Sequence, residues 1–301
     1  MMKDGEESDN PAIQQSSIPI LQYSSTPTIG RRFRKKPLAA AGLLGIALLA
    51  LLCFGSDIFA RHDPNAHGDL LTSRYLQPSM DHPFGTDKFG RDVFSRVLQG
   101  GKISLTIAFC VVSLAMTLGL LYGTVSGYFG GWVDAAMMRF LDFFLAFPAI
   151  FLILTIVAVF DLNHWYLIPI LGLTGWMEAA RIVRTEVLSL KERDFILAAK
   201  CLGFSHVRIL SRHIVPNCLT PLFVAATLKV AEVVLLESAL SFLGVGVQPP
   251  TASWGSIIND GRGVLLRAWW ISTFPGAFIV WSVVSFNLVS DGLQQALSPD
   301  R

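Results

Sequence analysis

Three charged side chains lie within a long apolar run between Pro216 and Val247, where they could do chemistry inside a membrane. They are Lys229, Glu232 and Glu237. A charge within a span costs about 2.5–3.5 kcal/mol on insertion scales, so these residues are candidates for a translocation path or for the interior of a helical bundle. Lys229 and Glu232 are three residues apart and can pair on one helix face, whereas Glu237 has no local partner.

Acidic and basic side chains also gather in a polar loop predicted over residues 61–102. Aspartate and arginine occur in acid–base catalysis, but one loop with no partner His or Cys gives little support for an active site. Four apolar residues of this loop recur at the spacing of one helix face: Phe89, Val93, Phe94 and Val97. We therefore predict a short amphipathic helix that leads into the next span and is capped by Thr86 or Asp87.

The longest charge-bearing segment, Glu178 to Pro216, separates two apolar blocks and carries seven Lys/Arg and four Asp/Glu. Its charges are interspersed with apolar residues at helical spacing, which predicts short amphipathic helices outside the bilayer. Gly203 can end one helix in a left-handed cap, and Ser205 can cap the start of the next. Pro216 stops that second helix or opens the following one.

These two helices are expected to meet at an angle on one side of the membrane. Ala198 and Ala199 would leave a shallow surface that another protein could approach closely. Ahead of the helices, Glu178 and Arg181 are three residues apart and can pair, and Arg181 and Arg184 can reach the lipid headgroups. The alternative is a solvated loop between two spans.

The composition indicates a membrane protein. The chain has 301 residues, of which 52% are hydrophobic and 15% charged, with a mean hydropathy of +0.52. Soluble domains carry roughly 25% charged residues. The net charge of +2 is too small to suggest a nucleic-acid partner. The four cysteines are far apart and have neither zinc- nor haem-binding spacing, so they predict no metal site and no disulfide framework.

Six apolar runs predict an all-α membrane protein with six transmembrane helices. Small residues spaced by four in the second run let helix backbones approach closely in lipid. The connection to the third run is expected over residues 127–139, and Pro148 should kink the third helix. The fourth run is short, and its helix is expected to continue past Glu178. The runs cover residues 38–60, 103–128, 140–160, 165–177, 217–247 and 269–289.

An even number of spans places both termini on one side of the membrane. The basic cluster Arg31–Lys36 directly precedes the first run, and positive charge is retained in the cytoplasm, so we predict cytoplasmic termini. The charged segment is then cytoplasmic, and the loops 61–102 and 248–267 are outside, the second with turns and one short helix. Residues 1–30 are polar and are expected to be disordered.

No nucleotide-binding or hydrolytic motif occurs in the sequence. Gly101-Lys102 is followed by Ile103 and lacks the upstream glycine of a P-loop, so we predict that the chain does not hydrolyse ATP. Neither Gly-x-Ser-x-Gly nor His-Glu-x-x-His is present. A membrane enzyme is therefore poorly supported.

Residues Ser189 to Pro216 resemble the cytoplasmic loop of ABC-type import permeases. The family pattern is Glu-Ala-Ala, three residues, Gly, and a Pro thirteen residues later. The residues that keep this spacing are Ala198, Ala199, Gly203 and Pro216. Leu197 stands where the family usually has Glu, and His213 and Val215 replace the usual Ile and Leu.

Other blocks are similar to the dipeptide/oligopeptide/nickel subfamily, so that the likeness extends over residues 80–297. One precedes the second span, one covers the fifth span and the outer loop after it, and one ends the chain. They are His82–Asp87 with Gly90–Arg96, Glu237–Pro250 with Ser253–Gly255, and Asp291–Leu293.

The resemblance implies the MetI-like fold of type I ABC importers, with a cytoplasmic coupling-helix loop, in the bacterial inner membrane. It also implies a second homologous permease, two cytoplasmic ATPase subunits and an extracytoplasmic binding protein as partners. ATP and Mg would bind to the ATPases, and this chain would hold no cofactor or metal. The ATPase-coupling residues would be Asp194, Ala198, Ala199, Lys200, Gly203, Ser205 and Pro216.

The expected domains follow from the spans and the resemblance. They are a disordered tail over 1–36, the first span over 37–60, an outer loop over 61–102, the MetI-like domain over 103–292 with its coupling loop over 178–216, and a cytoplasmic tail over 293–301.

Peptides are the expected substrates, with nickel or another small solute as the alternative. Two other functions stay open. A secondary transporter coupled to ions through Glu232 and Glu237 would need neither nucleotide nor partner. A scaffold or assembly protein would cause no transport defect when deleted.

Overall fold

The computed structural model describes residues 36–69, 72–159 and 164–297, and its regular elements there are helices. Residues 1–35 and 298–301 lie outside the described part, as do the predictions of a disordered tail and of a basic cluster before the first span. The elements are α2 (Pro37–Phe54), α3 (Ser56–Phe59), α4 (Val93–Phe129), α5 (Gly131–Leu145), α6 (Ala149–Val159), η1 (His164–Tyr166), α7 (Leu167–Leu190), α8 (Asp194–Cys201), α9 (His206–Ile209), η2 (Leu210–Ile214), α10 (Val215–Phe242), α11 (Trp254–Gly261), η3 (Arg262–Val264) and α12 (Trp270–Leu297).

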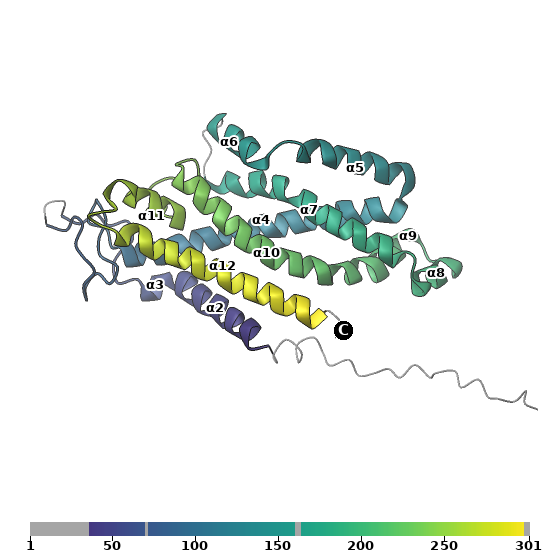
Figure 1. Cartoon of the computed structure of the whole chain (residues 1–301), viewed down its shortest axis with the longest axis horizontal. Coiled ribbons are helices and arrows are strands. Elements are labelled where there is room, and N and C mark those ends of the chain that lie inside the picture. Colours follow the sequence, from purple (N-terminus) through teal and green to yellow (C-terminus); the bar gives the residue numbers. More distant parts are fainter. Residues whose placement is uncertain (1–35, 70–71, 160–163, 298–301) are drawn as a thin grey trace, which may run out of the picture.

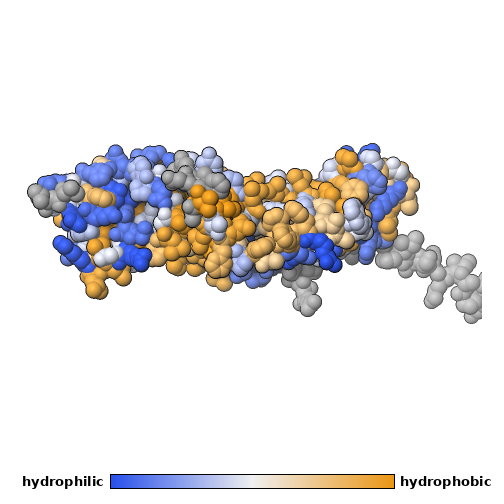
Figure 2. All heavy atoms as spheres, turned by 90° about the horizontal axis from the view of Figure 1, so that it is seen from above, coloured by the Kyte–Doolittle hydropathy of each residue, from blue (hydrophilic) through white to orange (hydrophobic). Residues whose placement is uncertain are grey.

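The long helices run side by side in one elongated bundle (Figure 1). α4 packs against α7, α10 and α2, and α12 packs against α2 and α10. α8 and α9 lie at one end of the bundle, and α11 lies at the opposite end (Figure 1). Figure 2 shows a mostly apolar surface between two more polar ends. This distribution fits a bundle whose middle lies in the hydrocarbon of a bilayer.

Four helices of the described chain are long and apolar enough to cross a membrane: α2, α4, the continuous helix from His206 to Phe242, and α12. The bent pair α5 and α6 makes a fifth if the pair is one span. α7 runs beside α4 but carries four charged residues, Glu178, Arg181, Arg184 and Glu186. The helical membrane fold is confirmed, and six spans result if α7 also crosses.

The close approach predicted for the second span occurs between α4 and α7. A Cβ atom at Gly123 would collide with the Ala180 carbonyl oxygen and lie 2.8 Å from the Val183 Cβ. Gly119 meets the Ala179 side chain in the same way, one turn earlier. Side chains at these positions would push the helices apart, so the glycines set the distance between α4 and α7.

The short helix predicted ahead of the second span is not a separate element. α4 begins at Val93, and its N-cap is Asp92, which accepts a hydrogen bond from the Ser95 N–H at 2.8 Å. Thr86 and Asp87 were expected to cap this helix, but they lie in the preceding turns. Gly90 in these turns has φ +70°, which no helix accommodates.

The connection predicted over residues 127–139 is also wrong, because those residues are helical except for Gly130. Gly130 has φ +64° and joins α4 directly to α5. Pro148, expected to kink the third helix, lies at a complete break: α5 and α6 are separated by three residues and differ in direction by 68°. The ring of Pro148 and its missing N–H prevent the helix from continuing.

The predicted separation of the second short helix from the fifth span is wrong. α9 continues through the π-helical turn η2 into α10, and together they form one helix of 37 residues. Pro216 is the second residue of α10 and closely follows the π turn, so it opens α10 without stopping the helix before it. The predicted C-terminal boundary also shifts, because α12 continues to Leu297.

The loop before α4 and the segment around α11 form a cap at one end of the bundle that rests on buried ion pairs. Asp87 is fully buried and accepts hydrogen bonds from Arg91 Nε at 2.7 Å and Arg96 Nη1 at 2.5 Å. Arg96 also contacts Asp260 of α11 at 3.2 Å, and Lys88 reaches the same carboxylate at 3.0 Å. The Asp and Arg residues that resembled catalytic groups thus join the loop before α4 to α11.

Two indole rings complete this cap. Trp254, the first residue of α11, is fully buried and donates its Nε1–H to the Val97 carbonyl at 3.0 Å. Trp270, the first residue of α12, donates to the Thr86 carbonyl at 3.2 Å. The short helix expected in the loop 248–267 is therefore α11, and it is packed onto the outer ends of α4 and α12.

Candidate coupling surface and transmembrane cleft

α8 and α9 sit on the bundle through one buried side. Ile196 and Ala199 of α8 and Ile209 of α9 are buried in an apolar cluster with Val187 and Leu190 of α7. The spacing of Ile196 and Ala199 gives α8 a narrow inner face, and the remaining residues face outward. The helices are therefore fixed to the bundle, not suspended in a loop.

The turn between α8 and α9 has the predicted caps. Gly203 adopts φ +74°, the left-handed geometry that glycine tolerates best, and its N–H donates to the Lys200 carbonyl at 3.0 Å. Ser205 is the N-cap of α9, and its hydroxyl oxygen accepts from the Arg208 N–H at 3.4 Å. Both predictions of local structure are confirmed.

Six of the seven predicted coupling residues are exposed: Asp194, Ala198, Lys200, Gly203, Ser205 and Pro216. Asp194 through Ser205 lie on α8 and the turn after it, whereas Pro216 lies at the start of α10. Ala199 is buried and faces the cluster beneath α8, so the expectation that it leaves a shallow surface is wrong. Since Ala198 and Ala199 point about 100° apart on a helix, only one of them can face a partner.

The segment from α8 to α9 also carries large apolar residues that are exposed, and of these the sequence analysis had singled out only Leu197. Leu202 is 73% exposed and Val207 is 75% exposed, and Phe195 and Leu197 of α8 are exposed as well. We call Phe195, Leu197, Leu202 and Val207 the apolar docking patch. The signal was present in the sequence, because Phe195 to Ala199 is more continuously apolar than a helix with one buried side requires.

Polar contacts between helices hold the base of this end. The Arg184 guanidinium of α7 donates to both carboxylate oxygens of Asp134 in α5, at 2.5 and 2.6 Å. The Tyr128 hydroxyl of α4 lies 2.8 Å from His206 Nδ1 of α9. α4, α5, α7 and α9 are thereby tied together next to the patch.

Lys229 lies between two carboxylates. Its Nζ is 2.8 Å from Glu178 Oε2 of α7 and 2.9 Å from Glu232 Oε2 of α10. The predicted pairing of Lys229 with Glu232 is confirmed. The predicted pair of Glu178 with Arg181 is not formed, because Arg181 bonds Asp142 of α5. The Glu178 and Glu232 side chains are 64% and 59% exposed, although Lys229 is nearly covered.

Glu237 lies in the bundle interior. Its side chain has no exposed surface, and it accepts hydrogen bonds from Ser104 Oγ of α4 at 2.8 Å and Ser241 Oγ at 2.7 Å. Ser104 in turn accepts from the Trp254 N–H at 3.3 Å. Of the two places predicted for Glu237, the structure gives the interior, where the carboxyl joins α4, α10 and the start of α11.

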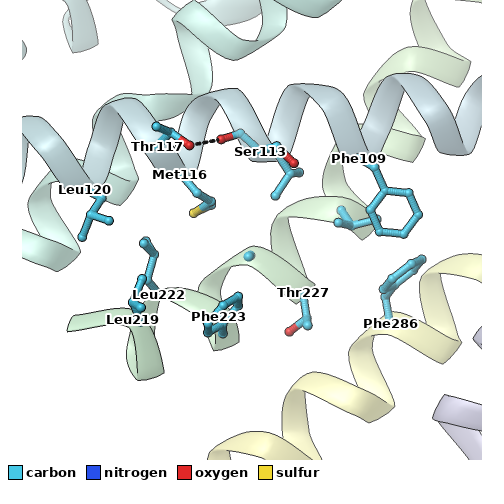
Figure 3. A pocket seen from close by; sticks show the side chains of 13 residues that line it. Phe109, Ser113, Met116, Thr117, Leu120, Leu219, Leu222, Phe223, Thr227 and Phe286 are labelled. Carbon is cyan, nitrogen blue, oxygen red and sulfur yellow. Dashed lines mark hydrogen bonds between the residues drawn. The ribbon is translucent and has the colours of Figure 1, made fainter. Parts of the chain in front are cut away.

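An open cleft of about 440 Å³ runs between α4, α10 and α12. Figure 3 shows its side chains pointing toward one another across the cleft, with Phe109 opposite Phe286. Its hydroxyl groups are partly satisfied locally, since Thr117 donates to the Ser113 carbonyl at 2.7 Å and Thr227 to the Val224 carbonyl at 2.7 Å. None of Lys229, Glu232 and Glu237 lines it. The cleft is apolar and offers no ionic site.

A family model describes more than half of this chain. Residues 115–301 match the binding-protein-dependent transport system inner membrane component. The chain belongs to this family. Residues 28–78 also match the N-terminal transmembrane domain of oligopeptide transport permease C. The matched regions include the predicted coupling loop over residues 178–216 and helix α2.

Curated relatives cover most of the chain. It is 38% identical over 268 residues to the oligopeptide transport system permease protein OppC of Bacillus subtilis, with 89% of this chain and 87% of that protein covered. It is also 38% identical over 282 residues to the dipeptide transport system permease protein DppC of the same organism, covering 93% and 87%. A crystal structure of an amino acid ABC transporter with histidines aligns with a TM-score of 0.49 at 14% identity, covering 66% of this chain and 94% of that one.

Family membership places the chain in the inner membrane as a multi-pass component of a transport system. The family is one of membrane components and not of enzymes, in agreement with the sequence.

Proposed function

We propose that this protein is the permease subunit of an ABC importer that moves dipeptides or oligopeptides. The observation that carries the proposal is the apolar docking patch, which is exposed at one end of the bundle on helices that are fixed to the spans. Large apolar side chains exposed together indicate a surface that a partner covers. The two Bacillus relatives are named as oligopeptide and dipeptide transport permeases, which supports peptides as substrates.

The partner at the patch is a cytoplasmic ATPase subunit. The predicted coupling residues Asp194 and Lys200 are exposed on α8 and add charged groups to this surface, and Ala198 is exposed between them. ATP and Mg bind to a pair of such ATPases, and this chain binds no nucleotide. Closure of the ATPases moves α8 and α9, and because α9 is continuous with α10, the motion passes into the membrane.

A second, homologous permease covers the other exposed features. Glu178 and Glu232 are more than half exposed at a depth where lipid would penalise them, so protein or water must face them in the assembly. In the assembly, this face forms part of the interface with the second permease, and the apolar cleft forms part of the substrate path. An extracytoplasmic binding protein delivers substrate at the α11 end, and both termini are cytoplasmic. Nickel or another small solute is the alternative substrate.

Replacing an apolar side chain of the docking patch by a charged one tests the proposal. We expect Leu202→Glu and Val207→Glu each to weaken association of the ATPase subunits at least about tenfold, since buried apolar anchors contribute more than 1.4 kcal/mol to such interfaces. The measurement is co-purification of the ATPases with the full complex and ATP-driven uptake of labelled peptide into proteoliposomes.

Leu266→Glu is the matched control, because Leu266 is a fully exposed leucine at the opposite end of the bundle. This variant should retain the ATPase subunits. Full ATPase binding by the Leu202 and Val207 variants would contradict the assigned docking surface. Uptake by this chain alone, without nucleotide, would instead support an ion-coupled secondary transporter.

A further inference from the structure

Three groups able to bind a metal ion converge at the outer end of the bundle. His62 follows α3, His82 lies in the turns before α4, and Asp92 is the N-cap of α4. Their ligand atoms all lie within 4.8 Å of one another. These residues are 20 and 10 positions apart in the sequence, so no short metal-binding motif revealed them, and the sequence analysis treated this loop as having no partner histidine.

The hydrogen bonds of Asp92 hold one of its carboxylate oxygens in a position to bind a metal ion together with His82. Asp92 Oδ2 accepts from the Ser95 N–H at 2.8 Å and the Ser95 hydroxyl at 2.7 Å, which fixes the carboxylate. The other oxygen, Oδ1, lies 2.9 Å from His82 Nδ1. Two ligands bound to a tetrahedral ion at about 2.1 Å each are separated by about 3.4 Å, so these two atoms need to move apart by only about 0.5 Å to share an ion.

His62 can supply the third ligand at small cost. Its ring lies 4.7 Å from the His82 ring, centroid to centroid, and its side chain is exposed, so a rotation brings a ring nitrogen closer to the other two atoms. A polar cavity of about 300 Å³ lined by His62, Ser95 and Asp63 opens beside the cluster and leaves room for water. Arg61 also lines this cavity, and its guanidinium donates to the Met80 carbonyl at 2.9 Å.

We propose that His62, His82 and Asp92 bind one divalent transition-metal ion of the Zn²⁺ class, with water in the remaining position. Two imidazoles and one carboxylate are ligands that such ions prefer over Mg²⁺ and Ca²⁺, which select oxygen ligands. The ion joins the end of α3 to the start of α4 on the outer side of the membrane. This inference does not depend on the proposed transport function, because the three ligands belong to this chain alone.

The test is Zn²⁺ binding by the full-length chain, purified in detergent, using metal analysis after dialysis against buffered Zn²⁺ and titration calorimetry with ZnCl₂. We expect one high-affinity ion per chain. His62→Ala should weaken binding at least about tenfold, because even residues that only orient ligands cost 10–100-fold when they are replaced. His82→Ala should do the same, and Co²⁺ should give visible d–d absorption that both variants lose.

His67→Ala is the matched control, since His67 lies in the same loop and outside the cluster, against the Phe89 ring. It should bind Zn²⁺ as the parent chain does. His62 is exposed, so its replacement leaves the fold intact, and circular dichroism checks this for every variant. Zn²⁺ binding that is absent from the parent chain, or that persists unchanged in His62→Ala, overturns the proposal.

Discussion

The Glu237 carboxyl shows how one buried residue joins three elements. It receives hydrogen bonds from Ser104 and Ser241, and through Ser104 it is linked to the first residue of α11. A buried group of this kind stabilises the fold only while its partners are present, because each donor left without an acceptor retains the cost of losing water. The outer ends of α4 and α10 are therefore held by a polar contact within an apolar bundle.

Replacement of this carboxyl should destabilise the protein by an amount that depends on the replacement. We expect Glu237→Ala to cost about 1–3 kcal/mol and to impair transport or assembly, since both serine hydroxyls lose their acceptor. Glu237→Gln keeps one acceptor oxygen and should cost less. Thermal unfolding of the purified chain in detergent measures both, and equal stability of Glu237→Ala and the parent would show that the contacts are dispensable.

Individual residues also show where sequence reasoning stops. The cap geometry of Gly203 and Ser205 follows from local chemistry, and both were predictable. The burial of Ala199 and the exposure of Ala198 depend on where α8 rests, which a pair of neighbouring alanines does not reveal. Asp142, the partner of Arg181, and Glu178, one of the two partners of Lys229, come from other helices 39 and 51 residues away, so only the tertiary fold selects them.

At the level of elements, the contact of α4 with α7 is the most closely fitted. The sequence predicted a close approach at this span, because small residues recur every four positions along α4, but it did not identify α7 as the partner. The start of α4 and the fusion of α9 with α10 were not predictable from periodicity. The apolar spacing around Val93 suits a helix that starts earlier, but the left-handed conformation of Gly90 interrupts it. At the other site, the π turn η2 joins α9 to α10, so α9 does not end where the sequence predicted.

A methyl group at this contact should be enough to disturb it. We expect Gly123→Ala to destabilise the protein by about 1–3 kcal/mol, because the added carbon meets a backbone oxygen that cannot move away. Gly276→Ala in α12 is the matched control: its Cβ would meet no atom within 4 Å. That substitution should be neutral or stabilising by up to about 1 kcal/mol. Thermal unfolding that ranks the two variants in the opposite order would contradict the packing described here.

On the scale of the whole molecule, the two ends of the bundle are built differently. The α8 end exposes the apolar side chains of the proposed docking patch, whereas the α11 end is closed by its own ion pairs. Burial of Asp260 disfavours its charged form, but the positive charges of Arg96, Lys88 and Arg91 outweigh this and hold the pKa of Asp260 below its usual value. The outer cap is therefore stabilised by a charge that acid removes.

Stability of the cap should consequently fall in acid. Because the folded-state pKa of Asp260 is depressed, the unfolded chain binds its proton more readily, and the contribution of Asp260 is present above about pH 4 and is lost as the pH falls further. Asp260→Asn should be less stable than the parent at neutral pH and should show a smaller loss of unfolding temperature between pH 6 and pH 3. Parallel pH profiles for the two proteins would refute this role.

The fusion of α9 with α10 has a mechanical consequence. A helix of 37 residues is about 55 Å long at 1.5 Å per residue, so a tilt of about 10° at one end displaces the other by about 10 Å. Such a helix converts a small rotation at one end into a large sideways displacement at the other. A small displacement at the α9 end of this helix would therefore also move its other end, where Glu237 and α11 are attached to it.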